Sequence, residues 1–140
     1  MIEDKYDVIF KAYKTFMQDK LDYDVTILKH YNGSKVDFPL VTLELTNNID
    51  ADSNSLLNID YFEWYYFTIN IYTKDMVVNE EQVASNVINN QICNLTMEFF
   101  RKINMKKVLN KFIPNIDNNI LRRNLQYEGQ FGNREQIIRR

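Results

Sequence analysis

The sequence predicts an α+β fold in which two helices pack on one face of a mixed or antiparallel sheet of about five strands. Two segments repeat apolar residues every three or four positions, as amphipathic helices do. Five other segments show strand-like alternation or strand-forming composition. Their order is helix, three strands, helix, two strands. Placing both helices on one sheet face buries these apolar stripes most simply.

The first helix is predicted over residues 2–21. Its acidic residues Glu3, Asp4 and Asp7 suit the positive N-terminal end of a helix dipole. The apolar stripe consists of Ile2, Tyr6, Ile9, Phe10, Tyr13, Phe16, Met17 and Leu21.

Two strands are predicted next, over residues 23–31 and 40–46. Between them, Asn32, Gly33 and Pro39 are typical turn residues. We therefore expect these two strands to form a β-hairpin.

Residues 47–59 are rich in Asn, Asp and Ser, so we expect a loop that is flexible in the free protein and ordered in an assembly. Residues 60–75 then carry the strongest β signal in the chain. One face of this strand presents Tyr65, Phe67, Ile69 and Ile71, and the other presents Trp64, Tyr66, Thr68, Asn70 and Tyr72.

The second helix is predicted to begin with Asn79 as its cap, with Glu80 and Glu81 in the first turn. Arg101 and Lys102 lie in its last turn, where basic residues suit the helix dipole. Its apolar stripe consists of Val83, Val87, Ile88, Ile92, Leu95, Phe99 and Ile103.

Two further segments complete the chain, a short one over residues 106–114 and a strand over 118–131. In the last strand, Arg123 falls in the apolar register, beside Arg122 in the polar register. The apolar face presents Leu121, Leu125, Tyr127 and Phe131, and the polar face presents Arg122, Asn124, Gln126, Glu128 and Gln130. The tail over 132–140 lacks a period, so we expect it to be flexible in the free protein.

Length and composition favour a single domain over residues 1–140, because 45% of the residues are hydrophobic and one core can be buried. No stretch has the length of a membrane span, so we expect no membrane contact. The acidic N-terminus is unlike a signal peptide, which favours synthesis in a cytoplasm.

Catalytic and metal-binding residues are sparse. Cys93 and His30 are single residues of their types, far apart in sequence, which argues against a zinc site or a Cys-His pair. Cys93 is expected to be a buried, inert thiol. Asp37 and Glu44 could be the acidic residues of a metal-dependent nuclease. Such a site has a lysine shortly after the second acid, but Thr46 occupies that position here. We therefore expect that the protein is not an enzyme and binds neither a cofactor nor a metal ion.

The charges divide unevenly along the chain. Residues 1–81 carry 15 acidic residues and 7 lysines, a net charge of −8, whereas residues 82–140 carry 10 basic and 4 acidic residues, a net charge of +6. This polarity fits nucleic-acid binding by the basic half, pairing within one fold, or head-to-tail association between copies. The sequence leaves these three possibilities open.

Four segments together resemble the small tail terminator proteins of long-tailed bacteriophages, also called tail completion or minor capsid proteins. They are "YFTINIYTKD", the helix beginning "NEEQVASNV", "FIPNIDNNILRRNLQYEGQF" and the terminal "IIRR". The likeness covers residues 60–140 and the predicted N-terminal helix and hairpin. It implies a curved sheet flanked by two helices and a structural, non-catalytic role.

What the resemblance implies is a ring, typically of six copies, on the end of the tail tube. Such a ring stops tube polymerisation and provides the surface to which the head attaches. The implied partners are further copies of the chain, the tail tube protein and a head-completion or neck protein. DNA would pass through the lumen without sequence-specific binding. The implied location is the tail-neck junction of the virion, after assembly in the bacterial host cytoplasm.

A closed ring requires two different patches that meet on neighbouring copies. The resemblance matches the late strand of these proteins at Arg122, Arg123, Tyr127, Glu128 and Gly129. We expect the arginine pair to meet carboxylates of a neighbouring subunit, or of a tube or neck protein, because guanidinium groups bind carboxylates bidentately. The alternative is that one arginine is bound within its own sheet and the other is solvated. The full candidate subunit or partner interface is Trp64, Tyr66, Tyr72, Arg122, Arg123, Tyr127, Glu128, Arg139 and Arg140.

Two rival functions remain beside the tail terminator. Another ring-forming neck protein, such as a head-completion or stopper protein, would have similar size and interfaces. A nucleic-acid-binding module is disfavoured because the aromatic residues around Trp64 lie in the acidic half and the isoelectric point is about 5.4.

Overall fold

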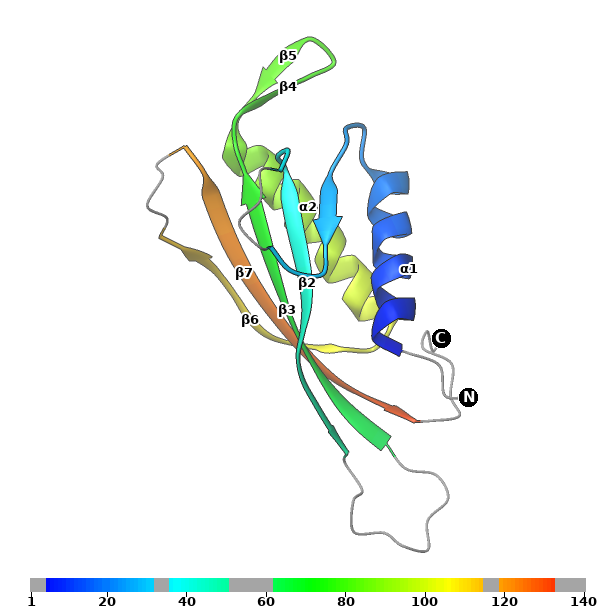
Figure 1. The fold of residues 1–140 in the computed structure, drawn as a ribbon. Coiled ribbons are helices and arrows are strands. Elements are labelled where there is room, and N and C mark those ends of the chain that lie inside the picture. The colour runs from blue at the N-terminus through cyan, green and yellow to red at the C-terminus, as the bar shows by residue number, and fades with distance from the viewer. Residues whose placement is uncertain (1–4, 32–35, 51–61, 115–118, 133–140) are drawn as a thin grey trace, which may run out of the picture.

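The computed structural model describes residues 5–31, 36–50, 62–114 and 119–132, and these form two helices and seven strands (Figure 1). The helices are α1 (Lys5–Lys20) and α2 (Ser85–Lys102). The strands are β1 (Thr26–Leu28), β2 (Leu40–Asp50), β3 (Phe62–Thr73), β4 (Met76–Val78), β5 (Glu81–Val83), β6 (Lys106–Ile113) and β7 (Leu121–Gly132).

Five strands form one sheet in the order β1-β2-β3-β7-β6, and β4 pairs with β5 in a separate small sheet. Within the large sheet β1 runs parallel to β2, and the other neighbouring strands are antiparallel. The central strand β3 pairs with β7 from Phe62 opposite Gly132 to Thr73 opposite Leu121. The predicted α+β fold with a mixed sheet is therefore confirmed.

Both helices pack on the same face of the large sheet, as predicted (Figure 1). An aromatic cluster joins them there. The ring of Tyr13 in α1 meets Phe99 of α2 edge-on, with centroids 5.3 Å apart, and the Tyr13 hydroxyl hydrogen-bonds Thr96 at 2.8 Å. Phe100 of α2 in turn stacks on Tyr127 of β7 at 4.6 Å. Because such rings bury large apolar areas in fixed geometries, this cluster holds both helices to the sheet.

The predicted hairpin between the first two strands is wrong, because β1 and β2 are parallel, with Thr26 opposite Leu40. β1 spans only Thr26–Leu28 of the strand predicted over 23–31, and Val25 and Ile27 are buried. Alternation of apolar residues determines which face of a strand is buried, but it carries no information about strand direction. The turn residues therefore suggested a connection that the structure does not make.

The predicted start of the second helix is also wrong. Asn79 and Glu80 have φ angles of 51° and 68° and form the turn of a β4-β5 hairpin, which Figure 1 shows projecting beyond the sheet. Asparagine tolerates this left-handed conformation and is common in two-residue hairpin turns. Val83, placed in the helix by its spacing, instead pairs with Met76. α2 begins at Ser85, and Val87 is 52% exposed and does not belong to the apolar stripe.

Two predicted flexible segments fall mostly outside the described residues. The loop predicted over 47–59 is strand up to Asp50, because β2 continues there opposite β3, with Asn47 opposite Tyr66. Residues 51–59 lie outside the described part of the chain. Of the predicted tail, Gly132 ends β7, and residues 133–140 lie outside the described part.

Candidate functional site

The two helices cover only one face of the large sheet. α1 and α2 lie on one face, and no helix or strand of the described residues lies across the other, which we call the open face (Figure 1). One end of the open face is covered by the segment after β1, where the rings of Tyr31 and Tyr72 lie 6.1 Å apart. Five predicted interface residues point to the open face, as the period of two required, and all are half-buried. They are Trp64, Tyr66 and Tyr72 of β3 and Arg122 and Glu128 of β7.

Arg122 is held on the open face by amide groups. Its Nε and one terminal nitrogen donate to Oδ1 of Asn70 at 3.3 and 3.2 Å. Nδ2 of Asn124 donates to the same oxygen at 3.0 Å, and Gln126 donates to Oδ1 of Asn124 at 3.2 Å. The guanidinium also lies over the Tyr72 ring, 5.4 Å from its centroid. Its partners here are neutral, so Arg122 keeps its charge on the open face.

Arg123 points the opposite way, toward α2, and is only 9% exposed. Its Nε donates to Oδ1 of Asn89 at 2.8 Å, and one terminal nitrogen donates to Oδ1 of Asn110 at 3.2 Å and approaches Sγ of Cys93 at 3.4 Å. The other terminal nitrogen donates to Oδ1 of Asn90. The two arginines therefore do not form one patch, and Arg123 is bound within its own domain. One part of the alternative, an arginine bound within its own chain, is met by Arg123, but Arg122 is hydrogen-bonded to Asn70 and half-buried instead of solvated.

Tyr127 is a core residue, at 3% exposure, and not an open-face residue. Burial raises the pKa of its hydroxyl to about 12. Its register placed it beside Leu125 on the apolar face, so the alternation had already indicated this position. Arg139 and Arg140, the last two candidates, lie outside the described residues.

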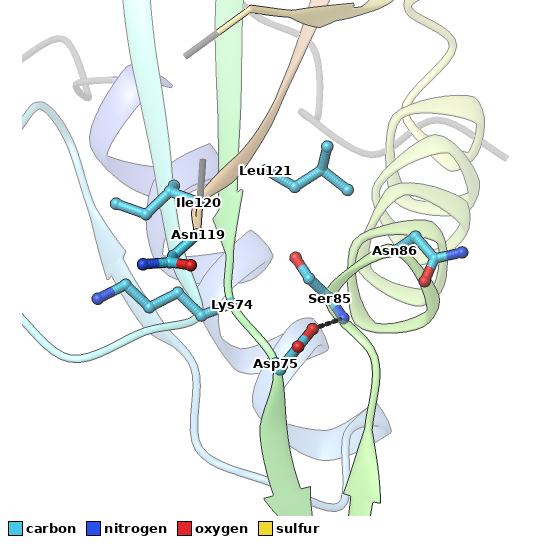
Figure 2. Close-up of a pocket in the computed structure, with 7 residues that line it drawn as sticks. All are labelled: Lys74, Asp75, Ser85, Asn86, Asn119, Ile120 and Leu121. Carbon is cyan, nitrogen blue, oxygen red and sulfur yellow. Dashed lines mark hydrogen bonds between the residues drawn. The ribbon is translucent and has the colours of Figure 1, made fainter. Parts of the chain in front are cut away.

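A pocket of about 560 Å³ lies where the β4-β5 hairpin leaves the sheet (Figure 2). Asp75 of its lining accepts a hydrogen bond from the backbone N–H of Ser85 at 2.7 Å, which Figure 2 shows as a dashed line. Ala84 precedes α2 and has no side chain that can cap it, so Asp75 serves as the cap from ten residues upstream. The lining residues are Lys74, Asp75, Ser85, Asn86, Asn119, Ile120 and Leu121.

The sequence did not indicate Asp75 as the cap, because the residue that caps a helix usually lies directly before it. No local pattern connects Asp75 with Ser85, since the hairpin that brings them together was not predicted. The carboxylate at this helix end has a structural use, because it satisfies an N–H group and complements the helix dipole.

Among the described residues, no group of three or more His, Cys, Asp or Glu side chains could hold a metal ion. Cys93 is buried at 1% exposure, where it accepts weak hydrogen bonds from Arg123 and from Asn110 at 3.7 Å. Asp37 is exposed, and Glu44 is half-buried on β2. In the described part of the chain, no helix has the length and apolar character to cross a bilayer.

No protein-family model matches this chain, and no curated protein matches it. The resemblance to tail terminators therefore stays a hypothesis that rests on the four quoted segments.

Proposed function

We propose that this protein is a structural tail terminator of a long-tailed bacteriophage. Copies of it form a ring on the last ring of the tail tube, stop tube polymerisation and provide the surface to which the head attaches. The role is one of assembly, in the virion at the junction of tail and neck, and it needs no catalytic group.

The observation that carries the proposal is the difference between the two sheet faces. The helix face is closed by a continuous apolar core. The open face presents Trp64, Tyr66 and Arg122, whereas Tyr72 is partly covered by the ring of Tyr31. Aromatic residues and arginine are the types enriched at protein interfaces. A half-buried aromatic surface outside that core supports a role as an assembly subunit.

The experiment is a tube-capping assay. Tail tube protein is polymerised alone and with this protein, and tube lengths and ends are measured by negative-stain electron microscopy. A terminator makes the tubes shorter, because it binds their growing ends, and it is seen as an added ring at one end. Tubes of unchanged length with bare ends would contradict the proposal. Binding to purified head-side neck protein, with no binding to tube ends, would instead favour a head-completion or stopper protein.

A further inference from the structure

The two ends of α2 carry opposite charges. Before its N-terminus lies the projecting β4-β5 hairpin, with exposed Glu80 and Glu81 at its turn. At its C-terminus lies a group of exposed basic residues in the last turn of α2 and the start of β6. These basic residues are Arg101, Lys102, Lys106 and Lys107. We call the first group the acidic turn and the second the basic end.

The basic end contains a small cleft of about 230 Å³. Arg101 and Lys107 contribute its charged groups, while Met97, Met105 and Tyr127 supply most of its apolar wall. Methionine side chains are flexible and polarizable, so the half-buried Met97 can adapt to an inserted side chain. A cleft with this composition suits the apolar stem and the carboxylate of a glutamate.

Among the described residues, neither Arg101 nor Lys107 forms an ion pair with a carboxylate. Glu128 lies opposite Lys106 in the register of β6 and β7. Glu98 pairs with Lys102 at 3.5 Å. Lys107 lies against Sδ of Met97 at 3.6 Å, which is a weak and neutral contact. The cleft therefore keeps the positive charge of Arg101 and Lys107.

The acidic turn cannot reach the cleft of its own chain. The 18 residues of α2 separate the two, which is about 27 Å at the rise of an α-helix. Figure 1 shows the hairpin projecting from one end of the molecule and the start of β6 at the far end of α2. Two complementary surfaces at opposite ends of one rigid element can meet only between copies, in a head-to-tail contact.

Apolar side chains accompany both charged groups. Val77 of the hairpin is 62% exposed, and Val108, next to Lys107, is 53% exposed. These are two of the five large apolar side chains that stand out as exposed in the described residues. Exposed apolar side chains close to charged groups are common in protein interfaces.

We infer that the Glu80–Glu81 turn of one copy docks in the Arg101–Lys107 cleft of the next copy. The occupant is a second copy of this chain, and the inference rests on the ring of the proposed function, for which it names the contacting surfaces. Each copy uses both surfaces, so the contact repeats around a closed ring.

The test is a charge exchange in the full chain. One variant carries Glu80→Lys and Glu81→Lys, and the other carries Arg101→Glu and Lys107→Glu. Alone, each variant brings like charges together at every contact. Mixed in equal amounts, each variant offers the surface that the other lacks, and an alternating ring with an even number of copies can close.

Sedimentation velocity over a concentration series measures the association. We expect the midpoint concentration of association to rise at least about tenfold for each variant alone, since like charges at an interface are strongly unfavourable. The equimolar mixture should return to near the wild-type midpoint with both variants in the complex. Because the contact is ionic, wild-type association should also weaken as salt rises.

Matched controls make the same charge changes on exposed positions elsewhere. They are Asp19→Lys with Asp22→Lys, and Lys14→Glu with Lys20→Glu, and both should associate like the wild type. Thermal melting of each variant shows whether its monomer is folded. If a reversal unfolds the monomer, the neutral pairs Glu80→Gln with Glu81→Gln and Arg101→Gln with Lys107→Gln replace it and should also weaken association.

The outcomes of this experiment distinguish a failure of the proposed contact from a failure of the proposed function. If the reversals leave association unchanged, or if the equimolar mixture does not restore it, this contact is wrong. A ring formed through other contacts would still be possible. A wild-type chain that stays monomeric at every concentration and does not bind tube ends overturns both.

Discussion

Nε of Arg123 donates a hydrogen bond to Oδ1 of Asn89 over 2.8 Å and so joins β7 to α2 inside the domain. Asn89 is fully buried, and its Nδ2 donates to Oγ1 of Thr73 in β3 at 3.1 Å. The Arg123 guanidinium also lies over the Phe112 ring of β6, 4.1 Å from its centroid. One side chain thus connects α2 to two neighbouring strands, and its charge is stabilised by amide dipoles.

Charge reversal at Arg123 should destabilise the isolated monomer. Arg123→Glu would place a carboxylate against the amide oxygens of Asn89, Asn90 and Asn110, which accept hydrogen bonds and repel negative charge. We expect a loss of about 3 kcal/mol or more in the free energy of unfolding, as for other buried charges that lose their partners. Thermal melting of the monomer measures it as a fall of several degrees.

Arg122→Glu is the matched control on the open face. Arg122 is half-buried and bound to a single amide oxygen, so the reversal should cost no more than about 1 kcal/mol. Equal melting temperatures for the two reversals would contradict the different environments of these arginines.

Gly129 has no room for a side chain. A Cβ built there would lie 2.9 Å from Cγ and 3.0 Å from Cε of Met105, which is buried. Gly129→Ala should therefore destabilise the domain by about 1 to 3 kcal/mol through overpacking. Chemical denaturation measures this, and combining it with Met105→Ala should cost less than the sum of the single changes. Strictly additive costs would mean that the two positions do not clash.

Asp75 should stabilise α2 through its hydrogen bond to Ser85. Asp75→Ala leaves that N–H without its carboxylate partner, and we expect a loss of about 1 kcal/mol, typical of a lost helix cap. Urea denaturation monitored by circular dichroism tests this. Asp37→Ala, at another exposed aspartate, is the control and should leave stability nearly unchanged.

Alkaline pH should weaken the fold through Tyr127. Burial raises the pKa of its hydroxyl from 10 to about 12, so the folded state retains a proton that the unfolded chain releases. The resulting stabilisation is fully present below pH 10 and is lost as pH rises toward 12. Tyr127→Phe, which keeps the ring that stacks on Phe100, should reduce this loss. Tyr31→Phe, at a 43% exposed position, should not. Unfolding free energies measured across this pH range compare the three chains.

The spacing of apolar residues was enough to predict the helices and strands that bury a continuous apolar face. The period of two in β3 assigned Tyr65, Phe67 and Ile69 to the core, and all three are buried there. Helical spacing likewise identified Ile9, Tyr13 and Met17 of α1. Such patterns are local, because they follow from the geometry of one helix or one strand.

Features that depend on contacts between residues distant in sequence could not be predicted from residue spacing. The β4-β5 hairpin, the parallel direction of β1 and the Asp75 cap each join segments whose proximity only the complete fold determines. Val83, for example, fits a helical stripe and a short strand equally well, and only its pairing with Met76 decides between them.

The arginine pair shows the same division. The sequence by itself determined that Arg122 and Arg123 lie on opposite faces of one strand, since successive side chains alternate. Only the tertiary structure decided what each face meets, because the three asparagine acceptors of Arg123 come from α2 and β6, 13 to 34 residues away in the chain. The charge of Arg123 is therefore tolerated at an apolar position of β7 because amide dipoles of α2 and β6 converge on it. No local sequence pattern predicts this arrangement.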